Sequence, residues 1–391
     1  MSDSGPARFG PASASFRLLC LCLEPGADAA AGERLRRVLS AGVDWVALAA
    51  IGNAHLMVPA LYRALGGKGL LTDVPDDFRD YLAAIYEANA GRMRAIRGQA
   101  GRALAALNAA GIAPVVLKGG AQLFEAEPGE AEARMMADLD LLVDEAHFAA
   151  ALAALGRLDY RPVPVPEGRR FHATTLIHGG EPVCIDLHRD IGPQHDLLPL
   201  REALREVIAL STGQCRLHIL SPTHRIMHGF FHSQIQNRGH LAGALPLRHL
   251  QDFALIAGRH RAAIDWTAIG EACARLRLSG AWEAFVHLAK RCLGAEPALA
   301  AGSSHAARRH YRRCLFQLDH PRLRAVLHLA MAASEPLSYA NIDYKYRCRG
   351  SRARLLRARA SELARLLGKY RHRVPRRIAA ALRDASGSEV L

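Results

Sequence analysis

The sequence has no long hydrophobic run. Nowhere among its 391 residues does an uninterrupted apolar stretch approach the roughly 18 residues that a membrane-spanning helix needs. The apolar stretch at residues 18–23 lacks a strong basic lead and is too short for the core of a signal peptide. We therefore predict a cytoplasmic protein with no transmembrane segment.

Paired cysteines are missing as well. None of the eight cysteines forms a C-x-x-C pair, and none has the neighbouring histidines that are typical of a zinc site. Scattered cysteines in a cytosolic protein usually behave as small apolar side chains. We expect all eight to be structural.

Most of the chain also lacks an excess of positive charge. The net charge is +14, but thirteen basic residues against one acid lie in the segment 345–377, which alone carries +12. The remaining 38 basic and 36 acidic residues nearly balance. A nearly neutral body is poorly suited to holding a long nucleic-acid backbone.

The basic segment has the pattern of an amphipathic helix. Its leucines fall at helical spacing with arginines between them: Leu355, Leu356, Leu363, Leu366 and Leu367. Such a helix can bind nucleic acid, an anionic membrane surface or an acidic partner. It can equally pack on the protein with its arginines in solvent. Regular aromatic interleaving, which would favour single-strand stacking, is absent.

Three carboxylates lie in stretches that alternate as strands do. Asp138 and Asp140 belong to residues 138–143, and Asp186 belongs to residues 183–188. Side chains two apart share one face of a strand, so a neighbouring strand could bring Asp186 beside the first pair. Clustered carboxylates repel one another unless a cation neutralises them, and oxygen ligands suit magnesium. Two-metal phosphoryl or nucleotidyl transfer uses this arrangement.

A glycine pair lies upstream of these carboxylates. The apolar stretch 111–117 predicts a short strand, followed by Lys118, Gly119 and Gly120 and then a helix over residues 121–125. Two glycines at a strand-to-helix turn let the backbone approach a phosphate, and the helix N-terminus offers amide groups to the anion. The lysine adds a point charge for phosphate oxygens.

In their order, these motifs resemble the uncharacterised nucleotidyltransferase family of bacteria, within the polymerase-beta-like nucleotidyltransferase superfamily. The matching residues are 116–120, 134–143 and 185–188, and a weaker similarity extends over about residues 35–300. The superfamily pattern is a Gly-Gly or Gly-Ser turn, an Asp-x-Asp strand and a third acid on a later strand. A lone Asp-x-Asp or Lys-Gly-Gly carries little information, whereas the combination is specific.

The resemblance implies an α+β fold, in which a small mixed β-sheet forms the nucleotidyltransferase core between N-terminal and C-terminal helical regions. It also implies that Asp138, Asp140 and Asp186 are catalytic and bind two Mg²⁺ ions, with an NTP as co-substrate. The residues expected to contact the NTP are Lys118, Gly119, Gly120, Arg134 and His188.

One feature departs from the superfamily pattern. More residues separate Gly120 from Asp138 than in the minimal superfamily pattern. The extra segment, residues 125–133, carries four glutamates close to the expected phosphate site.

Composition and periodicity divide the chain into five parts. These are a disordered N-terminus at 1–15, an N-terminal helical region at 16–110, the nucleotidyltransferase core at 111–220, a C-terminal helical domain at 221–343 and a basic helical tail at 344–391. Within the core, we predict a helix over 145–155 and a hairpin formed by 158–165 and 171–178.

Three histidines form a stripe in the C-terminal helical domain. His224, His228 and His232 are spaced by four residues, so they lie on one helix face. No glutamate follows the first histidine, as the H-E-x-x-H zinc motif would require. We therefore favour a polar stripe that faces the active-site cleft, or a helix–helix contact. For Asp252, we favour a structural role in orienting this domain.

The sequence thus predicts a magnesium-dependent nucleotidyltransferase, which moves an NMP from an NTP to a hydroxyl group on a small molecule, peptide or protein. One alternative is a nucleic-acid-modifying or toxin-like nucleotidyltransferase that uses the basic tail as an RNA arm. Another is a non-catalytic nucleotide-binding module, although the presence of all three carboxylates argues against it. The nucleotide base and the acceptor stay open.

Overall fold

The computed structural model describes residues 11–25, 29–127, 129–164, 173–191, 198–295, 304–334 and 351–370. The chain divides into two compact units. The larger unit is Met1–His240 with Leu245–Tyr311, and the smaller is Leu241–Ala244 with Arg312–Leu391.

Helices precede the sheet, as the periodicity predicts. They are α1 (Ala12–Leu23), α2 (Ala29–Ser40), α3 (Trp45–Ala54), α4 (Val58–Gly67) and the long α5 (Asp76–Ala109). The side chain of Asp44 caps α3 by accepting a hydrogen bond from the amide of Ala47, and α5 carries Asp76 and Asp77 in its first turn, where acidic residues suit the helix dipole. Helix α1 begins inside the range for which we predicted disorder, and residues 1–10 lie outside the described residues.

A mixed seven-stranded sheet follows. Its strands are β1 (Val115–Val116), β2 (Asp138–Leu142), β3 (Arg161–Pro162), β4 (Ala173–Ile177), β5 (Cys184–His188), β6 (Ile208–Thr212) and β7 (Cys215–Ile219). Their order is β3-β4-β5-β2-β1-β7-β6. The pairs β2–β5 and β1–β7 are parallel, and the others are antiparallel. The predicted α+β class, with a mixed sheet between helical regions, is confirmed.

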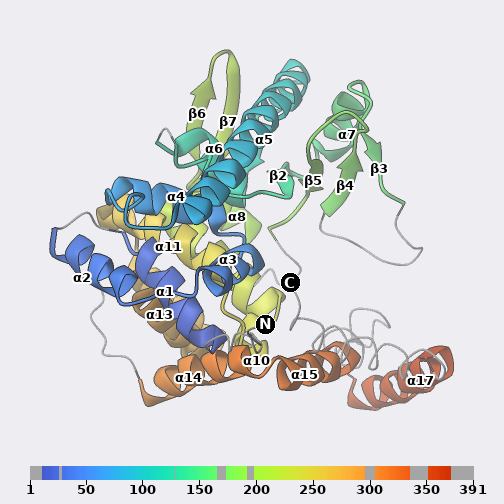
Figure 1. Ribbon diagram of the computed structural model, residues 1–391. Coiled ribbons are helices and arrows are strands. Elements are labelled where there is room, and N and C mark those ends of the chain that lie inside the picture. The colour runs from blue at the N-terminus through green and yellow to red at the C-terminus, as the bar shows by residue number, and fades with distance from the viewer. Residues whose placement is uncertain are drawn as a thin grey trace. The chain divides into compact units, whose positions relative to one another are not determined.

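One face of this sheet packs against helices. Helix α5 contacts β7 and the helix α7 (Phe148–Gly156), and Figure 1 shows α5 running beside the β6–β7 hairpin. Leu139 and Leu141 of β2 and Ile185 and Leu187 of β5 are fully buried in the core that these elements share. Because side chains alternate along a strand, the residues between them lie on the opposite face of the sheet.

Some predicted elements differ in their bounds. Helix α6 spans Lys118–Glu125, so it begins three residues before the predicted helix and contains both glycines. Helix α7 begins at Phe148 rather than at Glu145. The β3–β4 hairpin agrees with the prediction in the part that is described, since residues 165–172 lie outside it. The sequence pattern did not identify helix α8 (Leu200–Arg205) or the β6–β7 hairpin as separate elements.

Helices again follow the sheet. They are α9 (Pro222–Phe230), the π-helix η1 (Phe231–Gln236), α10 (Gly239–Ala242), α11 (Leu247–Arg259), the short η2 (Arg261–Ala263), α12 (Trp266–Arg275), α13 (Ser279–Leu293) and α14 (His305–Asp319). Helix α11 packs against α9 and α13, and α1 packs against α13. The N-terminal and C-terminal helices of the larger unit therefore form one helical body. Across the described ranges, no helix combines the length and the apolar character needed to cross a membrane.

The described cysteines are mostly buried. Cys20, Cys22, Cys273, Cys292 and Cys314 are buried, and Cys184 and Cys215 are half-buried. Cys348 lies outside the described residues.

The smaller unit contains the end of α14, helix α15 (Pro321–Ser334) and helix α17 (Arg352–Tyr370). Helix α17 covers the middle of the basic segment, and the rest of that segment lies outside the described residues. Leu356 and Leu363 are 58% and 44% exposed, whereas Glu362 is buried and paired with Arg365 at 2.6 Å.

Candidate active site

The parallel pairing of β2 with β5 brings the predicted carboxylates together. Asp140 lies directly opposite Asp186, and Asp138 lies opposite Cys184. His188 is the next residue of β5 on the same face as Asp186. Because the leucines and isoleucines of both strands fill the core, these polar side chains share the other face.

Asp140 holds the centre of the cluster. It is only 2% exposed, and its Oδ1 accepts a hydrogen bond from the Lys118 ammonium at 2.6 Å and lies 2.8 Å from Nε2 of His188. Burial alone would raise the pKa of Asp140, but the His188 hydrogen bond and the Lys118 charge outweigh it and lower the pKa well below its usual value. Asp140 is therefore expected to be ionised at neutral pH.

Asp186 lies beside Asp140 and has its own partner. The Thr175 hydroxyl on β4 donates a hydrogen bond to Asp186 Oδ1 at 2.6 Å. One potential ligand atom each from Asp140, Asp186 and His188 lies within 4.8 Å of the others, and this trio is the group in the described ranges that is placed to hold a metal ion. A divalent cation would offset the repulsion between the two carboxylates.

Asp138 lies at the entrance to the cluster and is half-buried. Burial, followed by the charge of Asp140, raises the pKa of Asp138 above its ordinary value, against the opposing effect of Lys118. Two carboxylates of one strand thus differ in acidity, because the deeper one has the hydrogen-bonding partners. Asp138 is not part of the compact trio, although all three predicted carboxylates border one region.

The Lys118–Gly119–Gly120 turn is part of helix α6 rather than a loop before it. Lys118 has φ +48°, a left-handed conformation that is uncommon for residues other than glycine and that tends to occur at functional sites. A Cβ on Gly120 would lie 2.6 Å from Val116, so this glycine lets α6 pack closely on the sheet. A Cβ on Gly119 would collide with the Arg134 guanidinium. The contact of both glycines with phosphate stays a prediction.

Arg134 joins the core to the C-terminal helices. Its Nε and one terminal nitrogen donate to the two carboxylate oxygens of Asp252 at 2.9 and 2.8 Å, and Gln122 of α6 donates to the same carboxylate at 2.8 Å. The Arg134 charge outweighs the effect of burial and lowers the pKa of Asp252. Asp252 on α11 therefore ties the helical domain to the core. Substrate contact by Arg134 and by His188 stays a prediction.

A cleft of about 110 Å³ opens in front of these groups, between α6, α9, η1 and α11. Lys118, Asp138 and Arg134 line one side of it, and His228 and His232 line another. The predicted histidine stripe is divided, because His224 does not reach the cleft and lies 3.7 Å from Glu206 instead.

The histidines of the cleft are neutral. Burial, then the charge of Lys118, lowers the pKa of His232 to about 3, and burial lowers the pKa of His249 to about 4. Burial also lowers the pKa of His228. His232 Nδ1 and His249 Nε2 lie 3.3 Å apart. These imidazoles can exchange hydrogen bonds with a ligand without adding charge to the cleft.

Two of the four glutamates of the segment 125–133 pair with basic side chains of the C-terminal helices. Glu125 pairs with Arg225 and with His260, the latter at 3.0 Å, and Glu130 pairs with Arg259 at 2.6 Å. These pairs neutralise two of the acids that the sequence places near the predicted phosphate site.

Sequence reasoning missed three residues around the cleft. Thr175 supports Asp186, Arg248 lines the cleft and its charge slightly opposes the rise in the pKa of Asp138, and His249 lies beside His232. No motif marks Arg248 or Thr175 in the sequence. The sequence alone could not predict their place in the site, because strand pairing and helix packing bring them there.

Comparison with known protein families assigns the chain to one of them. No curated protein and no solved structure matches the chain. A family model described as an uncharacterised nucleotidyltransferase matches residues 41–294, which is more than half of the chain. This match contains the glycine pair, the Asp-x-Asp strand, the Asp186 strand and the helices that line the cleft. The chain therefore belongs to the uncharacterised nucleotidyltransferase family, and its enzymatic class is that of a nucleotidyltransferase.

Proposed function

We propose that the protein is a magnesium-dependent enzyme that transfers an NMP from an NTP to a hydroxyl group of a small molecule, peptide or protein. The observation that carries this proposal is the β2–β5 register. It sets Asp140 opposite Asp186 in a buried cluster of ligand atoms within 4.8 Å of one another, in a member of a nucleotidyltransferase family.

The residues of the cluster fit a divalent cation. Carboxylate oxygens suit magnesium, whereas imidazole suits zinc and other transition metals better. His188 Nε2 is hydrogen-bonded to Asp140. The preferred metal ligands are therefore the carboxylate oxygens of Asp138, Asp140 and Asp186, and Asp186 would also help to hold a second ion. When bound, the cations would neutralise these carboxylates and the charge that develops on the phosphates.

The remaining side chains would hold the triphosphate. Lys118 lies beside Asp140 and supplies a positive charge for phosphate oxygens. The start of α6 would supply the amides of Lys118 and Gly119, because those of Gly120 and Ala121 donate to the Leu117 carbonyl. His188 fixes the orientation of Asp140 by its hydrogen bond. Positioning and charge neutralisation of this kind account for most catalysis of phosphoryl transfer.

Asp186 would act on the side of the acceptor. The acceptor hydroxyl oxygen forms a bond to the α-phosphorus, the bond from that phosphorus to the β-phosphate bridging oxygen breaks, and pyrophosphate leaves. Asp186 helps to remove the hydroxyl proton, which then passes to solvent. The Thr175 hydrogen bond holds the carboxylate in place for this role.

The test is an incubation of the full chain with each of the four α-labelled NTPs and a cell extract, followed by identification of the labelled species. Magnesium, manganese, zinc or a chelator is added in parallel. We expect a magnesium-dependent labelled product that Asp140→Asn abolishes. The matched control is Asp159→Asn, because Asp159 is exposed and has φ +62°, which asparagine tolerates. Labelling that persists in the chelator would contradict the proposal.

A second candidate is transfer to RNA with the basic tail as an arm, and exposed arginines favour it. Arg352, Arg354 and Arg357 of α17 are exposed, so an anion can reach them. Truncation after Asp343 tests this role. If the tail binds an anionic partner, salt-dependent affinity for RNA or anionic vesicles falls, while labelling of a small acceptor survives. If the truncated protein stays folded but loses both the salt-dependent affinity and the labelling of a small acceptor, the RNA-directed enzyme is favoured.

A further inference from the structure

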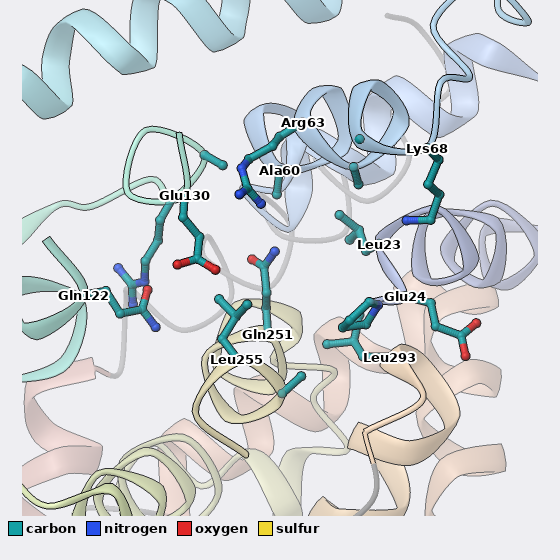
Figure 2. Close-up of a pocket in the computed structure, with 16 residues that line it drawn as sticks. Leu23, Glu24, Ala60, Arg63, Lys68, Gln122, Glu130, Gln251, Leu255 and Leu293 are labelled. Atoms are coloured by element: carbon teal, nitrogen blue, oxygen red, sulfur yellow. The ribbon is translucent and has the colours of Figure 1, made fainter. Parts of the chain in front are cut away.

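A second cavity lies next to the active-site cleft. It has a volume of about 280 Å³ and is bordered by α1, α4, α6, α11 and α13. Figure 2 shows Arg63, Glu130 and Gln251 pointing toward one another, while Lys68 enters from the opposite side. The cavity is close to the lower end of the range, roughly 300–1,000 Å³, in which small-molecule sites fall. No role assigned so far uses it.

The charges that face the cavity do not balance. Glu130 is neutralised by Arg259 at 2.6 Å, and Arg134 is neutralised by Asp252 at 2.8 Å. Within the described ranges, neither Arg63 nor Lys68 has a carboxylate partner within ion-pair distance. Arg63 is exposed to solvent, whereas Lys68 is half-buried and interacts with the charge of Glu24 from beyond ion-pair distance.

Lys68 is the more constrained of the two cations. It is half-buried and donates to the backbone oxygen of Cys22 at 2.9 Å, and burial lowers its pKa. Glu24 also lines the cavity and its charge acts on Lys68, but its carboxylate points away from the cavity in Figure 2 and lies against Gly294. A half-buried ammonium with no carboxylate within ion-pair distance favours an anionic ligand.

The rest of the lining suits an organic body. Leu23, Leu255 and Leu293 supply apolar surface, and the Gln251 amide can donate or accept a hydrogen bond. A ligand with an anionic group, a short carbon body and hydroxyl groups matches these walls.

The cavity and the cleft share a wall. Gln122 and Arg134 line both, and Asp252 binds both of these side chains. Arg134 also lies close enough to Asp138 and Asp140 for their charges to raise its pKa. A molecule in the cavity would thus be a neighbour of the site at which transfer takes place.

We infer that this cavity binds the acceptor, a small hydroxylated organic anion whose phosphate or carboxylate group lies between Arg63 and Lys68. This role rests on the proposed nucleotidyl transfer, for which the side chains of Gln122 and Arg134 in the shared wall would have to move aside so that a hydroxyl group of the bound molecule reaches the α-phosphate.

Calorimetry with the full chain tests the site directly. The probes are glycerol 3-phosphate and glycerate, which carry hydroxyl groups with a phosphate or a carboxylate. Each is titrated into the protein alone and into the protein with magnesium and a non-hydrolysable NTP analogue, which fills the cleft. The variants are Arg63→Gln and Lys68→Gln. The control is Arg94→Gln, since Arg94 is an exposed arginine of α5 outside the cavity lining.

We expect at least one probe to bind in the presence of the NTP analogue. Each cavity variant should weaken it about tenfold, as the loss of one charge-assisted contact predicts, and the control should not. The probe that binds more tightly shows whether the site prefers a phosphate or a carboxylate group. If neither probe binds, or if the cavity variants bind as wild type does, the inference is wrong. If the magnesium–NTP analogue itself fails to bind, the proposed function fails, and the titration of the protein alone still decides the anion site.

Discussion

Replacing Asp140 by asparagine separates the catalytic charge of this residue from its structural role. Asparagine has the same shape and keeps one oxygen that can accept a hydrogen bond. It removes the negative charge that Lys118 and His188 contact at 2.6 and 2.8 Å. Because Asp140 is 2% exposed, solvent does not replace that charge.

The cost in stability should be modest. A hydrogen bond to a charged group contributes about 1.5–3 kcal/mol. Lys118 and His188 both contact Oδ1, so the amide oxygen of asparagine can keep both contacts in a weaker form. The loss of repulsion between Asp140 and its neighbour Asp138 offsets part of the cost. We expect a net destabilisation of about 1 kcal/mol, which lowers the Tm of a chain of this size by about 1–2 °C.

The cost in activity should be much larger. A carboxylate that binds the catalytic cation contributes several kcal/mol to the transition state, so kcat should fall by about 10³-fold or more. Pyrophosphate release under saturating magnesium measures the rate, and a thermal scan of the same sample measures folding. Turnover within about tenfold of wild type would refute the metal assignment of Asp140. A collapse of the Tm would show that the residue is chiefly structural.

Three further predictions concern other groups of the cleft. Lys118→Ala should weaken NTP binding about ten- to a hundred-fold and leave nucleoside binding nearly unchanged, because the predicted contact is to phosphate. Calorimetry that shows equal losses of affinity for both ligands would contradict this role of Lys118. Asp186→Asn should lower kcat more than NTP affinity, and a comparable loss of affinity would place Asp186 with the first cation. His232 and His249 have folded-state pKa values of about 3 and about 4. The unfolded chain therefore takes up protons below about pH 6.5 that the folded protein does not, and the free energy of unfolding should fall from pH 6.5 toward pH 4. Urea titrations at pH 7.5 and 5 measure this slope, which His232→Gln should reduce; an unchanged slope would show that His232 is not buried as a neutral group.

The sequence determined which side of each strand faces the core. Alternation in residues 138–142 and 184–188 places Asp140 and Asp186 on the polar faces, since a period of two fixes side-chain direction without reference to any other part of the chain. The order of the glycine pair, the Asp-x-Asp strand and the third acid was enough to indicate the family.

Tertiary structure alone decided which residues meet. Alternation along β2 and β5 does not say that the strands are parallel neighbours, nor that Asp140 rather than Asp138 lies opposite Asp186. Register depends on how both strands pack against α5, which is a property of the whole core. For the same reason, the hydrogen bond of Thr175 to Asp186 has no signature in the sequence.

The cavity beside the cleft shows most clearly what the sequence alone could not determine. Its walls come from helices at both ends of the larger unit, and α1 meets α13 although more than two hundred residues separate them. Lys68 and Arg63 belong to an ordinary amphipathic helix and the turn after it when only their own neighbourhood is considered. They become a binding surface because helix packing leaves the cavity between them and Gln251. Local periodicity fixes the buried stripe of each helix, but the spaces between helices depend on side chains that are distant in the chain.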